Sequence, residues 1–243
     1  MKNKVAFVTG GSRGIGKNLC LRLLKEGWNV IFTYLSNETA AEQALSEFQR
    51  IEGRWALPLK VDISREDSPE IIASFIETNN IHLDVLVFNA GVTDRTEFGS
   101  IQTEAWTRIF YANVHFPVFL LQKLAMHLNV GCSILFTGSL MAIHPHSVSL
   151  SYGVTKSTVH ALIKNLVKFY ADKNIRVNGV APGFIETDWH VGKSKEIRNN
   201  IESKIALKRF GEPDEVTDVF MMLIQNTYIN GEIVVCDGGY SYK

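Results

Sequence analysis

The sequence has few of the features that mark secreted, membrane-spanning or nucleic-acid-binding chains. Its three cysteines are odd in number, widely spaced and set in apolar surroundings: Cys20, Cys132 and Cys236. This pattern favours reduced core thiols over disulfides or metal ligands. The first apolar run, Val5–Val8, is far too short for a signal peptide or a spanning helix. The formal net charge is 0, which gives no electrostatic reason to expect nucleic acid or a membrane as a partner. We therefore expect a cytoplasmic protein.

Prolines and glycines are scattered along the chain rather than gathered into linkers. There are 6 prolines and 18 glycines among 243 residues, with no low-complexity run, internal repeat or charged tail. This length and a hydrophobic fraction of 46% suit one α/β domain with a substantial core. Residues 1–243 are therefore predicted to form a single domain.

Strands and helices alternate along the sequence. Short apolar runs predict strands, and longer segments with helical apolar spacing predict helices between them. Pro117 is expected to bend one of these helices. Near-continuous apolar strands between amphipathic helices predict an α/β fold, a Rossmann-like, doubly wound parallel sheet of about seven strands with helices on both faces. The predicted strands cover residues 5–9, 29–34, 55–61, 85–88, 134–137, 175–180 and 232–235, and the helices 15–26, 37–51, 65–78, 104–128, 152–171 and 213–224.

A glycine-rich turn joins the first strand to the first helix. It reads Thr9-Gly10-Gly11-Ser12-Arg13-Gly14-Ile15-Gly16. Glycines here permit a tight turn and a close approach of backbone N–H groups to a pyrophosphate, which the N-terminus of the helix also favours. The spacing is Gly-x-x-x-Gly-x-Gly rather than the common Gly-x-Gly-x-x-Gly. The turn predicts a dinucleotide site, and a glycine turn that binds nothing is the alternative.

Tyr152 and Lys156 are four residues apart on a predicted helix, and Ser139 precedes Tyr152 by thirteen residues. Positions i and i+4 share a helix face, so the phenol and the ammonium can meet. At about 4 Å and an effective dielectric near 20, the ammonium would favour the phenolate by roughly 4 kcal/mol. We expect this to lower the pKa of Tyr152 towards neutrality, so that it can exchange a proton with a carbonyl or an alcohol. An ordinary surface pair is the alternative.

Several ordered motifs together resemble the short-chain dehydrogenase/reductase family over nearly the whole chain. Besides the glycine turn, they are Asn89-Ala90-Gly91, the set Asn113, Ser139, Tyr152 and Lys156, the segment Asn174–Asn178, Pro182-Gly183 and Asp237-Gly238-Gly239. Ordered motifs at compatible spacings are far more specific than any one of them.

The resemblance implies roles for four catalytic residues. Tyr152 would be the proton donor or acceptor on the substrate oxygen, and Lys156 would lower its pKa and bind the nicotinamide ribose. Ser139 would donate to the substrate oxygen. Asn113 would hold a water that links Lys156 to solvent. The ordinary alternatives are a turn residue for Ser139 and a helix hydrogen-bonder for Asn113.

The resemblance also implies a cofactor, which we expect to be NADP(H). An NAD site of this type needs a carboxylate at the end of the second strand, where this chain has Tyr34 and no acid. Glu38 is the nearest acid but falls in the next helix, whereas Arg13 inside the glycine turn, with Ser36 and Asn37, is expected to hold a 2′-phosphate. The implied cofactor contacts are Gly10, Ser12, Arg13, Gly14, Ile15, Gly16, Tyr34, Ser36, Asn37, Asp62, Ile63, Asn89, Ala90, Gly91, Tyr152, Lys156, Pro182, Gly183, Ile185 and Thr187.

The substrate is less defined. Gly183–Asp188 and Leu207–Pro213 resemble the β-ketoacyl-acyl-carrier-protein reductases of the family, which implies a 3-oxoacyl thioester substrate under a lid of about residues 184–210. Basic residues around the lid would steer an acidic carrier protein or form a solvated helix face: Lys193, Lys195, Arg198, Lys204, Lys208 and Arg209. Trp189 in this segment either packs or touches the substrate.

Other functions stay open at this point. They are a reductase of another ketone or of a secondary-metabolite or polyketide intermediate, a non-catalytic dinucleotide sensor, and an epimerase or dehydratase that uses the same Tyr–Lys pair. The resemblance implies a homotetramer, with a dimer as the alternative. His144-Pro-His146 lies near the expected pocket but lacks the clustered ligands that a metal needs, so no metal is predicted.

Overall fold

The computed structural model describes residues 4–145 and 148–242. Seven parallel strands form one sheet in the order β3-β2-β1-β4-β5-β6-β7. The strands are β1 (Val5–Val8), β2 (Asn29–Tyr34), β3 (Ala56–Lys60), β4 (Leu83–Phe88), β5 (Leu128–Thr137), β6 (Arg176–Pro182) and β7 (Ile233–Cys236). The predicted Rossmann-like, doubly wound parallel sheet is confirmed.

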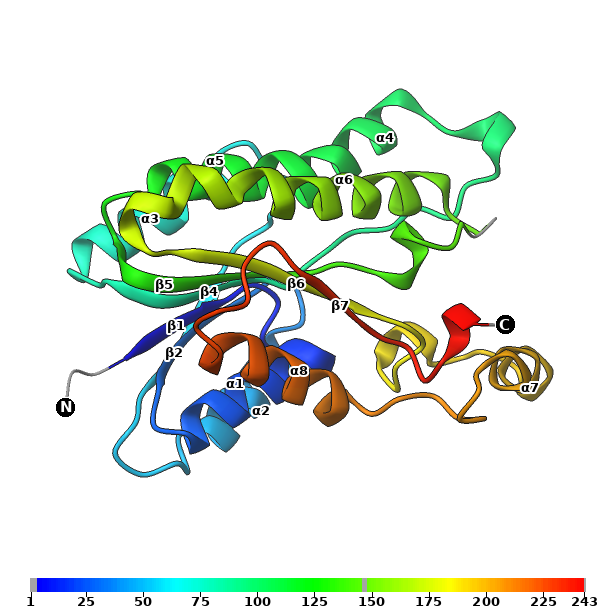
Figure 1. The fold of residues 1–243 in the computed structure, drawn as a ribbon, viewed down its shortest axis with the longest axis horizontal. Coiled ribbons are helices and arrows are strands. Elements are labelled where there is room, and N and C mark those ends of the chain that lie inside the picture. The colour runs from blue at the N-terminus through cyan, green and yellow to red at the C-terminus, as the bar shows by residue number, and fades with distance from the viewer. Residues whose placement is uncertain (1–3, 146–147, 243) are drawn as a thin grey trace.

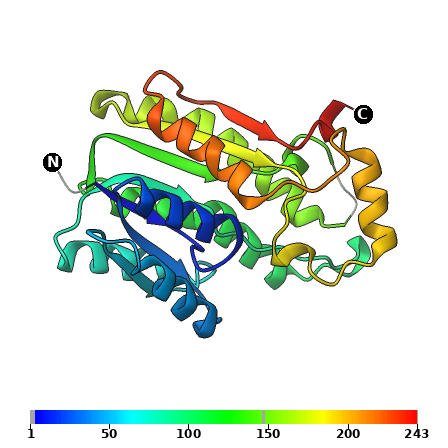
Figure 2. The same ribbon diagram turned by 90° about the horizontal axis from the view of Figure 1, so that it is seen from below.

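Helices cover both faces of the sheet (Figures 1 and 2). One layer holds α1 (Gly14–Lys25), α2 (Glu38–Phe48) and α8 (Pro213–Gln225), and the other holds α3 (Ser68–Thr78), α4 (Thr103–Phe110), α5 (Phe116–Lys123) and α6 (Leu150–Leu166). A further helix, α7 (Lys195–Lys204), lies beyond the carboxyl ends of the strands. Among the described residues, no helix is both long and apolar enough to cross a membrane.

Each face of the sheet has its own hydrophobic core, because the strands are apolar on both sides. In β1, the side chain of Phe7 joins the core that includes α3, α5 and α6. Its neighbours Ala6 and Val8 join the core that includes α1, α2 and α8. All three side chains are fully buried. The alternation follows from the period of two along a strand, and it explains why these strands read as continuous apolar runs.

The strand order reverses between β1 and β4. From β1 the chain runs outward through β2 to β3, and from β4 it runs outward the other way to β7. Such a reversal leaves a crevice at the carboxyl ends of the two central strands, where ligands bind in open α/β sheets. The glycine turn emerges from β1 at this point.

The prediction of one continuous helix over residues 104–128 is wrong, because the segment is divided into three parts and ends at Lys123. α4 gives way to a π-helical segment, Tyr111–His115, which precedes α5. Pro117 lacks the N–H that would bond the carbonyl of Asn113 in an α-helix, and its ring would crowd that carbonyl, so a wider turn relieves the conflict. The sequence anticipated a bend at Pro117 but not this change of helix type.

The fifth strand is longer than predicted. β5 begins at Leu128 rather than at residue 134, and Leu128 pairs with Leu83 before the register shifts. Asn129 interrupts the apolar pattern, yet its amide donates to the Asp84 carboxylate at 2.8 Å and is compatible with the strand. Helix boundaries also differ: α2 ends at Phe48 rather than at residue 51, α3 begins at Ser68 rather than at residue 65, and α6 ends at Leu166 and continues as a 3₁₀ segment over Val167–Lys173.

Arg176 ties the end of α8 to β6. Its buried guanidinium donates to the carbonyls of Leu223 at 2.7 Å, Ile224 at 2.9 Å and Ile229 at 3.2 Å. The first two carbonyls belong to the last turn of α8, which has no partners for them within the helix. Burial lowers the pKa of Arg176 from its ordinary value, but the guanidinium stays charged.

Replacing Arg176 with alanine is expected to destabilise the protein by about 3 kcal/mol, because these carbonyls lose their donors. The matched control is Arg50→Ala, at an exposed position just after α2, which should change stability by no more than about 0.5 kcal/mol. Urea unfolding followed by circular dichroism measures both changes. Equal effects of the two substitutions would contradict the capping role.

Candidate active site

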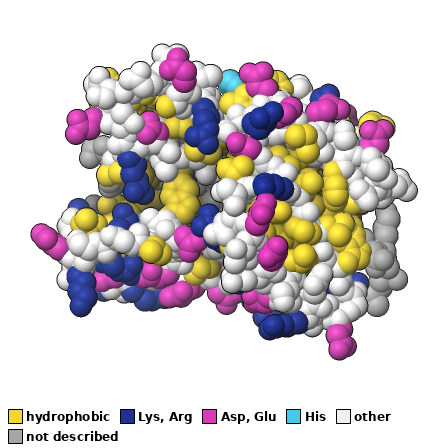
Figure 3. All heavy atoms as spheres, turned by 180° about the vertical axis from the view of Figure 1, so that it is seen from behind, with side chains coloured by type: hydrophobic (Ala, Val, Ile, Leu, Met, Phe, Trp, Pro, Cys, Tyr) yellow, Lys and Arg dark blue, Asp and Glu magenta, His cyan; other side chains and the backbone are white. Residues whose placement is uncertain are grey.

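A cavity opens at the carboxyl ends of the strands. In the view from behind, the surface is hollowed on the left-hand side, at this end of the sheet (Figure 3). The cavity is lined by Gly10, Ser12–Gly16, Thr33–Leu35, Val61–Ile63, Asn89–Val92, Thr137–Ser139, Tyr152, Lys156, Pro182, Gly183, Ile185 and Thr187–His190. Most predicted site residues thus lie around one space, and Ser36, Asn37 and Asn113 are the predicted residues that do not line it.

The glycine turn forms the floor of the cavity where a pyrophosphate would lie. Gly10 has a φ of +68°, which favours glycine, and a Cβ at Gly16 would come within 2.2 Å of the Gly10 carbonyl. The first turn of α1 has no side-chain cap and no acidic residue. Its unpaired N–H groups and the positive end of the helix dipole are therefore free for an anion, which fits a dinucleotide.

Asn89 connects the glycine turn to the neighbouring strand ends. Its side-chain amide donates to the carbonyls of Thr9 at 3.0 Å and Gly10 at 3.1 Å, and its oxygen accepts from the Thr137 hydroxyl at 3.1 Å. A Cβ at Gly16 would lie 2.5 Å from the same amide nitrogen. One side chain therefore holds together the exits of β1, β4 and β5.

At the far end of the cavity, polar side chains are engaged in local turns. The Asp62 carboxylate accepts from the N–H of Ser64 at 2.9 Å and from its hydroxyl at 2.7 Å. Asn37 accepts from the N–H of Ala40 at 2.9 Å and so caps α2. Asp62 still lines the cavity, whereas the side chain of Asn37 serves the helix.

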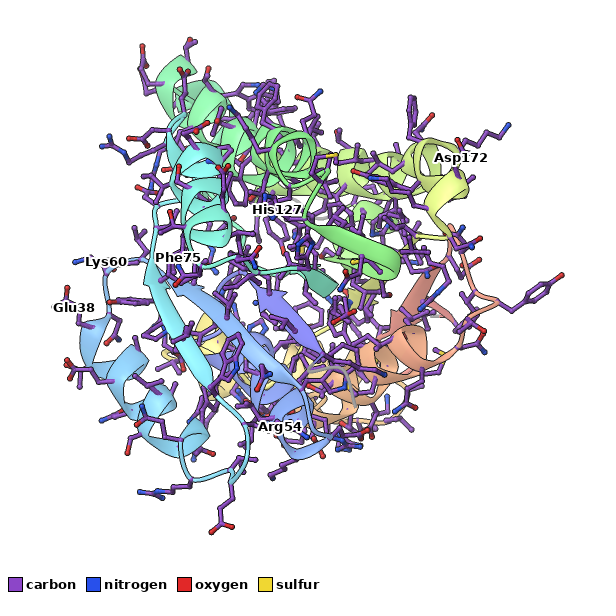
Figure 4. The ribbon with its side chains drawn as sticks, turned by 90° about the vertical axis from the view of Figure 1, so that its left-hand side faces the viewer. Glu38, Arg54, Lys60, Phe75, His127 and Asp172 are labelled. Carbon is purple, nitrogen blue, oxygen red and sulfur yellow. The ribbon has the colours of Figure 1, made fainter. Side chains whose placement is uncertain are left out.

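Glu38 is turned away from the cavity. Its carboxylate pairs with the Lys60 ammonium at 2.5 Å, and Figure 4 shows the two labelled side chains side by side at the β3 edge of the sheet. The hydrogen bond from Lys60 and its charge lower the pKa of Glu38. Glu38 is also not among the residues that line the cavity, so it supplies no carboxylate there.

Arg13 links the glycine turn to the segment after β6. Its guanidinium pairs with Asp188 at 3.0 Å, and both side chains are more than half exposed. A partner at this exposure contributes little stability, so Arg13 can exchange it for another anion.

Tyr152, Lys156 and Ser139 meet at the exit of β5 and form the candidate reaction centre. Ser139, Tyr152 and Lys156 all line the cavity, and a side-chain hydrogen bond from Ser139 acts to lower the pKa of Tyr152. Ser139 Oγ also accepts from the N–H of Met141 at 3.1 Å. The Lys156 ammonium donates to the Thr137 carbonyl at 2.6 Å and lies 5.5 Å from the centre of the Tyr152 ring.

Burial, rather than Lys156, dominates the ionisation of Tyr152. The pKa of Tyr152 is raised to about 12, because the effect of burial outweighs the opposite effect of the hydrogen bond from Ser139. The expected lowering by Lys156 is wrong for this arrangement, because the ammonium is directed at the Thr137 carbonyl and is itself buried. Burial lowers the pKa of Lys156 to about 8. A phenol that is protonated at neutral pH is suited to donate a proton.

Asn113 lies in the π-helical segment and is 4% exposed. Its Oδ1 accepts from the N–H of Val92 at 2.8 Å, and its Nδ2 donates to the Val92 carbonyl at 2.9 Å and to the Thr155 hydroxyl at 3.0 Å. The side chain therefore holds the loop after β4 against α6. Its role in holding a water stays a prediction.

Some residues of the cavity were not predicted. Thr33, Leu35, Val61, Val92, Gly138, Asp188 and His190 each adjoin a predicted residue or Trp189 in sequence, and Thr137 is two residues before Ser139. Their place in the loops at the strand ends could have indicated them, whereas their residue types could not. Trp189 does face the reaction centre: its ring lies 5.6 Å from that of Tyr152, at an angle of 50°.

The described residues contain no group of three or more His, Cys, Asp or Glu side chains that could hold a metal. His146 of the His-Pro-His segment lies outside them. All three cysteines are free, with Cys20 and Cys132 buried and Cys236 partly buried.

Comparison with known proteins agrees with this geometry. The family model described as "Enoyl-(Acyl carrier protein) reductase" matches residues 10–241. Glucose 1-dehydrogenase 2 of Bacillus subtilis is 33% identical over 250 residues, which cover 98% of this chain and 95% of the relative. The 3-oxoacyl-[acyl-carrier-protein] reductase FabG of Aquifex aeolicus is 32% identical over 253 residues, with 98% of each chain covered.

A solved structure gives the same result for the fold. A short chain dehydrogenase from Burkholderia cenocepacia in complex with NADP has a TM-score of 0.89 and 26% identity, with 98% of each chain covered. The similarity spans nearly the whole chain. The named relatives differ in substrate at about the same identity, so the likeness singles out no one substrate.

The stability of the protein is expected to fall as the pH decreases from about 6.5 to about 4. Burial, together with nearby cations, lowers the pKa of both His160 and His190 from 6.5 to about 4. Between these values the unfolded chain binds protons that the folded chain does not, so acid favours unfolding. Thermal midpoints across this range measure the effect. His190→Gln should flatten the dependence, and the exposed control His144→Gln should leave it unchanged; an unchanged slope in His190→Gln would contradict the assignment.

Proposed function

Because the chain belongs to the short-chain dehydrogenase/reductase family, we propose that it reduces a 3-oxoacyl thioester to the 3-hydroxyacyl product with NADPH. As a member of this family, it is an oxidoreductase of C=O and CH–OH groups that uses a nicotinamide dinucleotide. The observation that carries the proposal is the meeting of Ser139, Tyr152 and Lys156 in the cavity that the glycine turn also lines.

In this proposal each residue of the reaction centre has one task. The Tyr152 hydroxyl donates its proton to the substrate oxygen, and the raised pKa keeps that proton in place at neutral pH. The Ser139 hydroxyl donates a hydrogen bond to the same oxygen and stabilises the charge that develops there. The Lys156 ammonium, anchored on the Thr137 carbonyl, has further protons to offer to a ribose. The bound nicotinamide supplies the hydride.

The cofactor in the proposal is NADP(H). Glu38, the nearest acid after β2, does not line the cavity, whereas Arg13 does, and the partner of Arg13 there is the exposed Asp188. A guanidinium binds a phosphate through charge-assisted, often paired hydrogen bonds. The relative from Burkholderia cenocepacia is a complex with NADP, which also supports this choice.

The lid of the proposal covers residues 184–210, which include α7. Two of its basic side chains are already paired, Arg198 with Glu186 and Arg209 with Glu215. Fewer free cations remain to steer an acidic carrier protein, so a free thioester is as compatible with this surface as a carrier-bound one.

A ketone of another class is the second candidate, and Trp189 favours it. The ring lies 5.6 Å from the Tyr152 ring and narrows the approach to the phenol. A flat or compact carbonyl compound would fit beside the Trp189 ring more readily than a branched one.

We also propose that the protein is a homotetramer, with a dimer as the alternative. Apolar side chains are exposed on the outer side of α5, on α6 and on the 3₁₀ segment after it: Phe119, Val154 and Phe169 at 45%, 38% and 83%. Exposed apolar side chains on one helical layer favour association. Sedimentation velocity measures the assembly directly.

Tyr152→Phe should abolish carbonyl-dependent oxidation of NADPH, a loss of at least about 10³-fold, while NADPH binding changes little, because the substitution removes only the proton donor. The assay follows NADPH absorbance with acetoacetyl thioester, free and carrier-bound, beside a panel of simple ketones. An enoyl thioester without a β-keto group is the matched negative substrate. Turnover of the variant at the wild-type rate would refute the role of Tyr152, and no turnover of any carbonyl by the wild-type protein would refute the proposed reaction.

Arg13→Ala should weaken NADPH binding by roughly 30-fold and leave NADH binding nearly unchanged, since a charge-assisted contact contributes about 2 kcal/mol. Fluorescence titration with each nucleotide measures this. Asp188→Asn, which removes the competing carboxylate, is the matched control and should keep or improve NADPH binding. Equal losses for NADPH and NADH in Arg13→Ala would contradict a 2′-phosphate contact.

A further inference from the structure

One face of α6 contacts the exit of β5 three times. Tyr152 is hydrogen-bonded to the Ser139 hydroxyl, and the Lys156 ammonium donates to the Thr137 carbonyl at 2.6 Å. One turn further along the helix, Nε2 of His160 accepts from the backbone N–H of Ser139 at 3.3 Å. The first two side chains already have roles in the proposed reaction, and His160 has none.

The chain at the end of β5 is shaped to let this ring approach. A Cβ at Gly138 would lie 2.3 Å from Nε2 of His160 and 3.1 Å from the Val180 carbonyl. The N–H of Gly138 is itself bonded to that carbonyl at 2.7 Å, so the backbone cannot easily shift aside. Only glycine at residue 138 is compatible with the imidazole in this place.

The imidazole is in the right state to accept a hydrogen bond. Burial, together with the charges of Lys156 and Lys164 on the same helix, lowers the pKa of His160 to about 4. The ring is therefore neutral at physiological pH. Because Nε2 accepts, the proton of the ring is on Nδ1.

Ser139 has a backbone position that this contact helps to define. Ser139 is 6% exposed, and its backbone is extended, with φ −166° and ψ 148°. Its Oγ accepts from the N–H of Met141. With both its N–H and its Oγ held, the direction of the hydroxyl towards Tyr152 is determined. A buried N–H without an acceptor would be costly, so loss of the imidazole would move the backbone at this residue.

We propose that His160 is a positioning residue, which fixes the backbone N–H of Ser139 and thereby aims the Ser139 hydroxyl at the substrate oxygen beside Tyr152. This inference rests on the proposed function. It concerns a side chain that touches neither substrate nor cofactor and acts only through Ser139.

Two substitutions at residue 160 separate the hydrogen bond from simple packing. His160→Leu fills a similar space without an acceptor, whereas His160→Gln places an amide oxygen near the position of Nε2. In the full-length protein, backbone exchange at Ser139 should be at least about tenfold faster in His160→Leu than in the wild type, and close to wild type in His160→Gln. Thermal midpoints establish that both variants are folded.

Kinetics with the most rapidly reduced carbonyl of the panel give the second readout. His160→Leu should lower kcat by roughly tenfold with little change in KM for NADPH, and His160→Gln should restore most of it. In a Ser139→Ala background, His160→Leu should have no further effect, because it acts through that serine.

Unchanged exchange at Ser139 in His160→Leu would overturn the inference, as would equal losses in the leucine and glutamine variants or additive losses with Ser139→Ala. Failure of the proposed function looks different. If the proposed function is wrong, the wild-type protein reduces no carbonyl. His160 then has no role in carbonyl reduction, although slow exchange at Ser139 would still report the hydrogen bond between the two residues.

Discussion

A buried lysine bonded to the end of a strand is the contact on which the rest of the site depends. Lys156 is 4% exposed, and its ammonium donates to the Thr137 carbonyl at 2.6 Å. A buried cation that left this partner would be uncompensated, so the bond pins α6 to the exit of β5. Tyr152 one turn before and His160 one turn after then reach Ser139 from the same helix face. This attachment places the helix face that carries Tyr152 and His160 against Ser139.

Thr137 also joins the reaction centre to the cofactor loop. Its carbonyl accepts from Lys156, and its hydroxyl donates to Asn89, whose amide holds the carbonyls of Thr9 and Gly10. The glycine turn and the catalytic tyrosine of the proposal are thus positioned on one hydrogen-bonded frame built on three adjacent strand ends. Neighbouring parallel strands end at the same edge of the sheet, and this is why residues distant in sequence share the frame.

Much of this could be predicted, and the failures have identifiable causes. The glycine turn, and Tyr152 and Lys156 on one helix face, depend on local spacing, and the structure places them as expected. The helix over 104–128 was wrong because Pro117 forces a π-helical segment, which apolar periodicity does not reveal. The expected low pKa of Tyr152 was wrong because spacing predicts that an ammonium is near but not what it bonds to or how deeply the phenol is buried.

The sequence by itself determined the fold class, the dinucleotide turn, the helix that carries Tyr152 and Lys156, and the lack of an acid at the end of β2. These features depend on adjacent residues or on the periodicity of apolar side chains, and both can be obtained from the sequence without knowledge of tertiary contacts. Only the tertiary structure decided that His160 holds Ser139, that Arg13 meets Asp188, and that Trp189 stands over Tyr152. The partners in each of these contacts come from helices and loops that are distant in sequence, so their meeting, and the burial that sets the pKa of Tyr152, depend on how the layers pack.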